Sequence, residues 1–377
     1  MTRTRHILLV AAAATAVGVF LVTVPTFREF FDLGVYRGAV RHWLVGGGEL
    51  YDYLYQGTEY GFTYPPFAAL VLSPLALTSW PVAIAFSVAL NAACVALLLR
   101  WYVLPILRRP LWMPIALVFL AVLVFEPARD TFSFGQVNLA LLVLVCSDLR
   151  RTQWRGIGIG LAAAIKLTPA VFIGYLILTR QYRAAAIASG TAAGATALAF
   201  LVAPDTSRRF WTEALWDTDR VGNLAYVSNQ SLRGVVARLD ISSIWWLLAV
   251  AAILVVWWLG VRSLDDDPTG FAMTGIVACL ISPVTWVHHL VWLLPALFLL
   301  AARASRRGLV ALAAVYVLLS SSVVWLWWAG ADGFLAVIGS NTYVWISIGL
   351  LLALQAPGRA TDPWRRRAPS IRRVPTT

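Results

Sequence analysis

The chain has 377 residues, of which 60% are hydrophobic and 13% are charged, and its mean hydropathy is +0.76. These values exclude an ordinary soluble domain and predict an integral membrane protein. The net charge of +12 comes from 29 arginines and one lysine, which fall mostly in short loops and at the C-terminus. That distribution argues against a nucleic-acid-binding protein and is typical of the cytoplasmic side of a membrane protein.

The apolar runs do not alternate residue by residue, so we expect an all-α, polytopic helical bundle rather than a barrel. Residues 7–24 are expected to be the first span, entering from the cytoplasm after two arginines. A cleaved signal peptide is the alternative, but its apolar core is usually shorter. A first extracytoplasmic loop is then expected over 27–63, and Tyr64-Pro65-Pro66 follows it as a helix-breaking turn.

The remaining elements are predicted in order along the chain. An interfacial helix is expected at 67–78, external loops at 126–134 and 204–240, and further spans at 80–100, 111–125, from 135 onward, 184–202, 242–261, 270–281, 289–300, 309–329 and 343–354. Residues 156–179 are bounded by basic residues and have Lys166 and Pro169 near the middle, which predicts a hairpin of two short helices. The total is about 12 spans with the hairpin counted as two, or about 10 with both halves re-entrant.

This topology gives one transmembrane domain over 1–358 and a basic cytoplasmic tail, expected to be disordered, over 359–377. It puts 20 of the 29 arginines in the cytoplasm and 13 of the 18 acidic residues outside. Acidic residues contribute little to orientation, so their excess outside is a separate observation that favours an extracytoplasmic polar site.

The unusual polar residues fall at this outer face, and they are Asp32, Gln136, Asn138, Lys166, Gln230, Arg233, His288 and His289. Asp32 is either a solvated loop acid or a catalytic one. Lys166 is the only lysine. It is expected either to face a cavity and a partner, as intramembrane cations usually do, or to snorkel at a helix end.

Gln136 and Asn138 could bind a ligand or simply cap helix ends. Adjacent helical residues point in different directions, so at most one of His288 and His289 is expected to face a given site. The only other external histidine is His42, and this spacing does not predict a metal site.

Seven motifs stand in a fixed order along residues 32–292. They are Asp32-Leu33-Gly34-Val35-Tyr36, Leu50-Tyr51, Phe62-Thr63-Tyr64-Pro65-Pro66, Gly135-Gln136-Val137-Asn138, Lys166-Leu167-Thr168-Pro169, Asn229-Gln230-Ser231-Leu232, and Ser282-Pro283 with His288-His289. In this order they resemble the motifs of the polyprenol-phosphate-mannose-dependent α-(1→2)-mannosyltransferases. These enzymes form glycosyltransferase family 87 of the C-type superfamily and are typical of actinobacteria.

The resemblance implies a multi-pass plasma-membrane enzyme with the C-type fold and an active site that opens outside the cell. The donor would be polyprenyl-phosphate-mannose and the acceptor a mannosylated lipid of the phosphatidylinositol mannoside, lipomannan or lipoarabinomannan type. No cofactor, metal or nucleic acid is implied, and membrane lipids are the other partners. The family's acidic residue corresponds to Asp32, and its histidine pair to His288 and His289.

The chemistry of this reaction assigns roles to the same residues. A phosphodiester leaves readily, so the transfer needs one base for the acceptor hydroxyl and cations for the phosphate. We therefore expect Asp32 to be the base, with inversion at the sugar. Lys166 and Arg233 are the expected phosphate ligands, and one of the histidines would assist the base or contact the phosphate.

Gln136, Asn138 and Gln230 are expected to bind sugar hydroxyls. Tyr36, Arg37 and Tyr64 are further substrate-binding candidates.

Two other functions compete with this interpretation. A related transferase could use another polyprenyl-phosphate sugar such as arabinose. A lipid or sugar transporter would instead show an inverted repeat and polar residues at the midplane of both halves, and no clear repeat is present.

Overall fold

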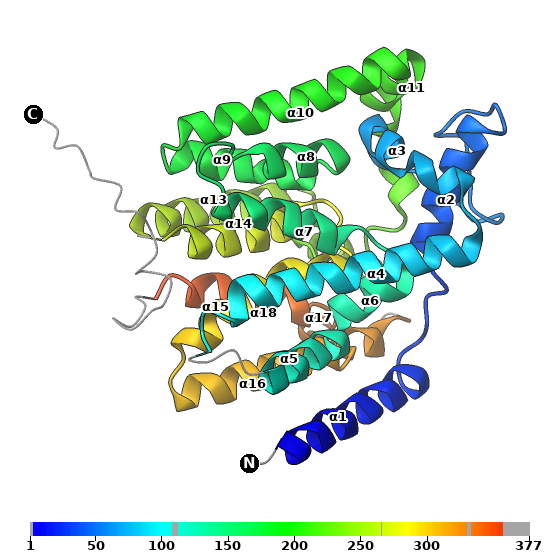
Figure 1. Ribbon diagram of the computed structural model, residues 1–377. Helices are drawn as coiled ribbons and strands as arrows, with labels where there is room; N and C mark the ends of the chain where they lie inside the picture. Colours follow the sequence, from blue (N-terminus) through cyan, green and yellow to red (C-terminus); the bar gives the residue numbers. More distant parts are fainter. Residues whose placement is uncertain (1–2, 108–111, 265, 330–332, 357–377) are drawn as a thin grey trace, which may run out of the picture.

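The computed structural model describes residues 3–107, 112–264, 266–329 and 333–356 (Figure 1). The boundary at 358 and the tail expected at 359–377 lie outside these residues. Within the described ranges the chain is helical, and its β pairing is an isolated bridge between Leu54 and Gly61. An all-α fold was predicted from the apolar runs, and the structure confirms it.

Eighteen α-helices follow one another in the described residues. They are α1 (Arg3–Thr23), α2 (Phe31–Leu44), α3 (Pro66–Leu72), α4 (Trp80–Leu98), α5 (Trp112–Val124), α6 (Glu126–Phe134), α7 (Asn138–Ser147), α8 (Ile157–Ile165), α9 (Val171–Leu178), α10 (Tyr182–Val202), α11 (Pro204–Arg209), α12 (Leu232–Arg238), α13 (Ile244–Ser263), α14 (Asp267–Ile281), α15 (Leu294–Arg303), α16 (Arg306–Ser320), α17 (Phe334–Ser340) and α18 (Thr342–Ala353). Four short 3-10 segments also matter below: η1 (Ser73–Leu77), η4 (Thr168–Ala170), η7 (Val287–Leu293) and η8 (Val323–Trp327).

Four helices in the described residues are long and apolar enough to cross a membrane: α1, α4 with its continuation to Val103, α10 and α13. Two bent pairs, α5 with α6 and α17 with α18, raise the number to six if each pair is one span. Further apolar helices have 10–17 residues and are too short for this criterion. A helical membrane protein is therefore confirmed, and the total of about 10 to 12 spans stays a prediction.

The hairpin at 156–179 is present as α8 and α9, and the chain breaks between them at Lys166, whose backbone is extended. The interfacial helix expected at 67–78 is present as α3 and η1.

The prediction of a loop at 126–134 is wrong, because these residues form α6, which is inclined by 72° to α5. Proline in the first turn and Gly135 in the left-handed conformation at the end define this helix. The loop expected at 27–63 likewise contains α2.

The helices pack in successive layers (Figure 1). The long helix α10 covers α8 and α9, which lie on α7 and α14, while α1 lies at the opposite side of the molecule against α5. Most buried residues form one large apolar core, and a smaller core joins α2, α3 and η1. Val137 and Ile165 pack against both cores, so they mark the seam between them.

The contact between α8 and α10 depends on a small residue. A Cβ atom at Gly160 would lie 2.5 Å from the carbonyl oxygen of Ala188 in α10, whereas a Cβ at Gly190 in the same helix would meet no atom within 4 Å. Small residues allow close approach of membrane helices.

We expect Gly160→Val to separate α10 from the hairpin and to cost about 1–3 kcal/mol of stability, because the added atoms would meet backbone rather than a flexible side chain. Thermal unfolding of the detergent-solubilised protein measures this. Gly190→Val is the matched control and should unfold close to the wild-type temperature. Equal unfolding temperatures for both variants would contradict the packing argument.

Candidate active site

The first turn of α2 holds Asp32 in place. The chain enters α2 through Glu29 and Phe30, both with positive φ, and the backbone N–H of Phe30 donates to the carbonyl of Ser133 at 2.8 Å. Leu33 packs on Gly135, where a Cβ atom would come within 2.6 Å of the leucine side chain. These contacts tie the start of α2 to the end of α6 and turn Asp32 towards the residues that follow Gly135.

Gln136 is the hydrogen-bond partner of Asp32. Its Nε2 donates to Oδ2 of Asp32 at 2.7 Å, and its Oε1 accepts from the hydroxyl of Tyr64 at 3.1 Å. Burial removes water from the carboxylate and raises the pKa of Asp32 to about 6, and the hydrogen bond from Gln136 opposes this rise. The carboxylate is therefore poised to accept a proton near neutral pH.

Three further side chains extend this contact into a network. The hydroxyls of Tyr36 and Tyr64 form a hydrogen bond of 2.9 Å, and Nδ2 of Asn138 donates to Oε1 of Gln136 at 3.3 Å. The backbone carbonyl of Gln136 accepts from Asn91 at 3.3 Å. Gln136 thus lies at the centre of contacts from α2, α4 and the start of α7.

Lys166 reaches the same network from the break between α8 and η4. Its Nζ lies 3.1 Å from Oδ1 of Asn138, 3.4 Å from the hydroxyl of Tyr64 and 2.8 Å from Nε2 of His289. It also lies 5.1 Å from the centre of the Tyr64 ring. Lys166 was expected either to face a partner or to snorkel at a helix end. In the structure its amine has polar partners inside the protein.

The hydrogen bonds of His289 determine which of its ring nitrogens carries the proton. Its Nδ1 accepts the backbone N–H of Trp286 at 3.1 Å, so the proton of a neutral ring lies on Nε2, facing Lys166. A neutral amine at Lys166 would satisfy every contact, because it would accept from His289 and donate to Asn138 and Tyr64. These contacts are mutually consistent without a bound ligand.

His288 lies next to the pair formed by Lys166 and His289, with its ring against that of His289. Its backbone carbonyl accepts from Thr131 of α6 at 3.1 Å and from Asn138 at 3.4 Å. Its ring packs against Phe134, and its Nε2 is buried without a hydrogen-bond partner among the described residues. Nε2 of His288 is therefore without a hydrogen-bond partner in the described residues, whereas Nε2 of His289 is already bonded.

Three predicted site residues lie outside the network. Arg37 donates to the carbonyl of Thr78, and the guanidinium of Arg233 stacks over Trp246 with 5.4 Å to the ring centre. Gln230 is fully buried and donates to the carbonyls of Val227 and Ser340. Their observed contacts hold neighbouring segments together.

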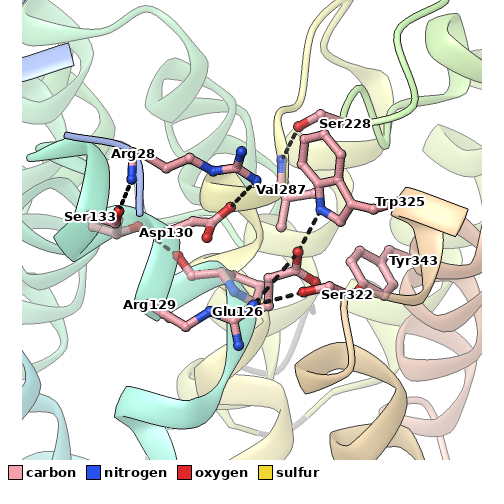
Figure 2. A network of polar contacts seen from close by, with 12 residues as sticks. Arg28, Glu126, Arg129, Asp130, Ser133, Ser228, Val287, Ser322, Trp325 and Tyr343 are labelled. Atoms are coloured by element: carbon pink, nitrogen blue, oxygen red, sulfur yellow. Dashed lines mark hydrogen bonds and ion pairs between the residues drawn. The ribbon is translucent and has the colours of Figure 1, made fainter. Parts of the chain in front are cut away.

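Sequence reasoning missed a buried charged cluster on α6, which Figure 2 shows. Glu126 accepts from the indole of Trp325 at 2.7 Å and from the hydroxyl of Tyr343, and Arg129 donates to Ser322 at 2.7 Å. The spacing of Glu126, Arg129 and Asp130 by three and four residues was the signal that could have placed them on one helix face. No group of three or more metal-ligating side chains lies together in the described ranges.

Comparisons with known proteins agree with the motifs of this site. The family model described as glycosyltransferase family 87 matches residues 62–283. A polyprenol-phosphate-mannose-dependent alpha-(1-2)-phosphatidylinositol mannoside mannosyltransferase of Mycobacterium tuberculosis is 35% identical over 83% of this chain and 79% of its own length. Its counterpart of the same name in Mycolicibacterium smegmatis is also 35% identical, over 73% of this chain and 70% of its own.

A third relative, also from Mycolicibacterium smegmatis, is a polyprenol-phosphate-mannose-dependent alpha-(1-2)-phosphatidylinositol pentamannoside mannosyltransferase, 36% identical over 72% of this chain and 69% of its own length. No solved structure matches the chain. The family model covers more than half of the sequence, and the relatives cover more than two thirds of it. The chain therefore belongs to glycosyltransferase family 87.

Proposed function

We propose that the protein transfers mannose from polyprenyl-phosphate-mannose to a hydroxyl of a phosphatidylinositol mannoside, forming an α-(1→2) linkage. Donor and acceptor are those in the names of its relatives. The observation that carries the mechanism is the continuous chain of polar contacts from Asp32 through Gln136 and Asn138 to Lys166 and His289.

Asp32 is the general base in this proposal. It takes the proton of the acceptor hydroxyl as that oxygen forms a bond to the anomeric carbon of mannose. The bond between that carbon and the phosphate oxygen breaks, and polyprenyl phosphate leaves with the electron pair. Because attack and departure occur on opposite faces, a β-linked donor gives an α-linked product.

Lys166 and His288 are the proposed phosphate ligands. An anion at hydrogen-bond distance favours the ammonium form of a lysine, so Lys166 would bind the phosphodiester as an ammonium ion. The buried free nitrogen of His288 supports a second contact. We leave Gln230 and Arg233 outside the site, because their side chains already bind Val227, Ser340 and Trp246.

The location also belongs to this proposal. We place the enzyme in the plasma membrane with about 10 to 12 spans in a C-type arrangement and the Asp32 network on the extracytoplasmic side. The distribution of arginines supports this orientation, because positive residues mark cytoplasmic loops.

Replacing Asp32 by Asn tests the base. We expect Asp32→Asn to lower the rate by about 10²- to 10⁴-fold, because an amide cannot accept the hydroxyl proton. Membranes containing the variant are supplied with radiolabelled polyprenyl-phosphate-mannose and phosphatidylinositol mannosides. Asp205→Asn is the control, since the Asp205 side chain is 86% exposed and lies in α11. A near-normal rate for Asp32→Asn would remove Asp32 from the mechanism.

The pH dependence follows from the raised pKa of Asp32. A base must be ionised, so kcat/KM should fall as the pH drops below about 6, where the carboxylate takes up a proton. Gln136→Leu removes a hydrogen bond that stabilises the ionised form, and the acid limb should therefore move to higher pH. Initial rates across a pH series measure both, and an acid limb that does not move in Gln136→Leu would argue against the assignment.

A further inference from the structure

A cavity of about 880 Å³ lies on the other face of α2 from Asp32. Its wall includes Arg28, Arg37, Tyr55, Trp80, Ile84 and Phe134. On a helix with 100° per residue, Arg37 and Gly34 project away from the side that carries Asp32 and Tyr36. The size is within the range of sites that enclose small ligands. Apart from the sequence-based expectation that Arg37 binds substrate, none of the roles assigned above uses this cavity.

Two arginines give the cavity its charge. The guanidinium of Arg28 lies between the rings of Trp325 and Phe134, at 4.6 and 5.5 Å from their centres, and Figure 2 shows it turned towards Asp130. The separation from the Asp130 carboxylate is 3.9 Å, and Nε of Arg28 is buried with no hydrogen-bond partner in the described part of the chain. In the described residues the guanidinium of Arg28 is thus held by two aromatic rings and by a carboxylate at 3.9 Å.

Arg37 is held by a neutral group. Its Nε and Nη2 donate to the carbonyl of Thr78 at 3.1 and 2.6 Å, and a neutral carbonyl fixes a guanidinium without neutralising it. Glu29 also lines the cavity, but it is exposed to solvent. The cavity is thus lined by two cations and one acid. The acid is exposed to solvent, and the carboxylate of Asp130 lies 3.9 Å from Arg28. This balance of charge favours an anionic ligand.

The position of the cavity favours a lipid as the ligand. It adjoins Phe27, four residues after the end of α1, and Trp80, the first residue of α4. Both helices are candidate membrane spans, so the cavity lies where two spans leave the apolar layer. Lipid phosphates occupy this level of a bilayer, and tryptophan is enriched there.

We infer that the cavity binds the phosphodiester of a membrane lipid, held by Arg28 and Arg37, with the aromatic walls against the groups attached to the phosphate. The consequence for catalysis rests on the proposed function: the donor phosphate is bound there by Lys166 and His288, so the expected ligand of this cavity is the phosphodiester of the phosphatidylinositol-based acceptor. The end of α6 and the residues after it connect the cavity to the reaction site, because Phe134 lines the cavity and Gln136 binds Asp32.

Direct binding tests the inference without turnover. Fluorescent phosphatidylinositol and polyprenyl-phosphate-mannose are titrated separately into the purified protein in nanodiscs of neutral lipid. Arg37→Gln removes one charged ligand of the phosphate, so the Kd of the lipid that occupies the cavity should rise about tenfold. That lipid should be phosphatidylinositol, and a rise confined to polyprenyl-phosphate-mannose would contradict the separation of the two phosphate sites. Arg41→Gln, an exposed position on the same helix, is the matched control and should not change either Kd.

A second variant separates ligand binding from folding. Arg37→Gln also removes the contacts to Thr78, whereas Ile84→Trp leaves both arginines in place and fills the cavity. It should weaken binding of the same lipid. Unchanged Kd values for both lipids in both variants would overturn the inference. Intact lipid binding together with absent mannosyl transfer in the wild-type protein would instead contradict the proposed function alone.

Discussion

The hydrogen bond between Gln136 and Asp32 is the contact on which the site depends. A carboxylate at the seam between two apolar cores loses hydration, and an unpaired charge there would be costly. One amide donor stabilises the ionised form, yet the pKa of Asp32 remains raised to about 6. A stronger partner such as an arginine would hold the carboxylate ionised but would also make it a poorer base.

The same glutamine explains why segments distant in sequence have to pack correctly. Its amide oxygen accepts hydrogen bonds from Tyr64 and Asn138, and these two residues bind Lys166 at the break between α8 and η4. The seam marked by Val137 and Ile165 is therefore where the small core around α2 contacts the main bundle. Movement of one core against the other would change the distances in this network.

Helix α6 links the network to the lipid cavity. Its buried charges bind η8 and α18, its Thr131 binds the carbonyl of His288, and its Phe134 lines the cavity. Buried polar groups of this kind are costly unless they are paired, and the pairing orients the helix. Asp32, the proposed base, and the cavity proposed to bind a lipid phosphate thus lie on opposite faces of α2, and the end of α6 and the residues after it contact both.

Much of this protein followed from its amino-acid order alone. The apolar runs determined a helical membrane protein, Lys166 and Pro169 predicted the broken hairpin, and the ordered motifs indicated the family. Local patterns can do this because helix breaking and membrane insertion depend on neighbouring residues. The partners of each polar side chain depend instead on how distant segments pack. Only the tertiary structure could therefore turn the supposed loop 126–134 into a buried helix, bring Lys166 to His289, and leave Gln230 and Arg233 outside the network.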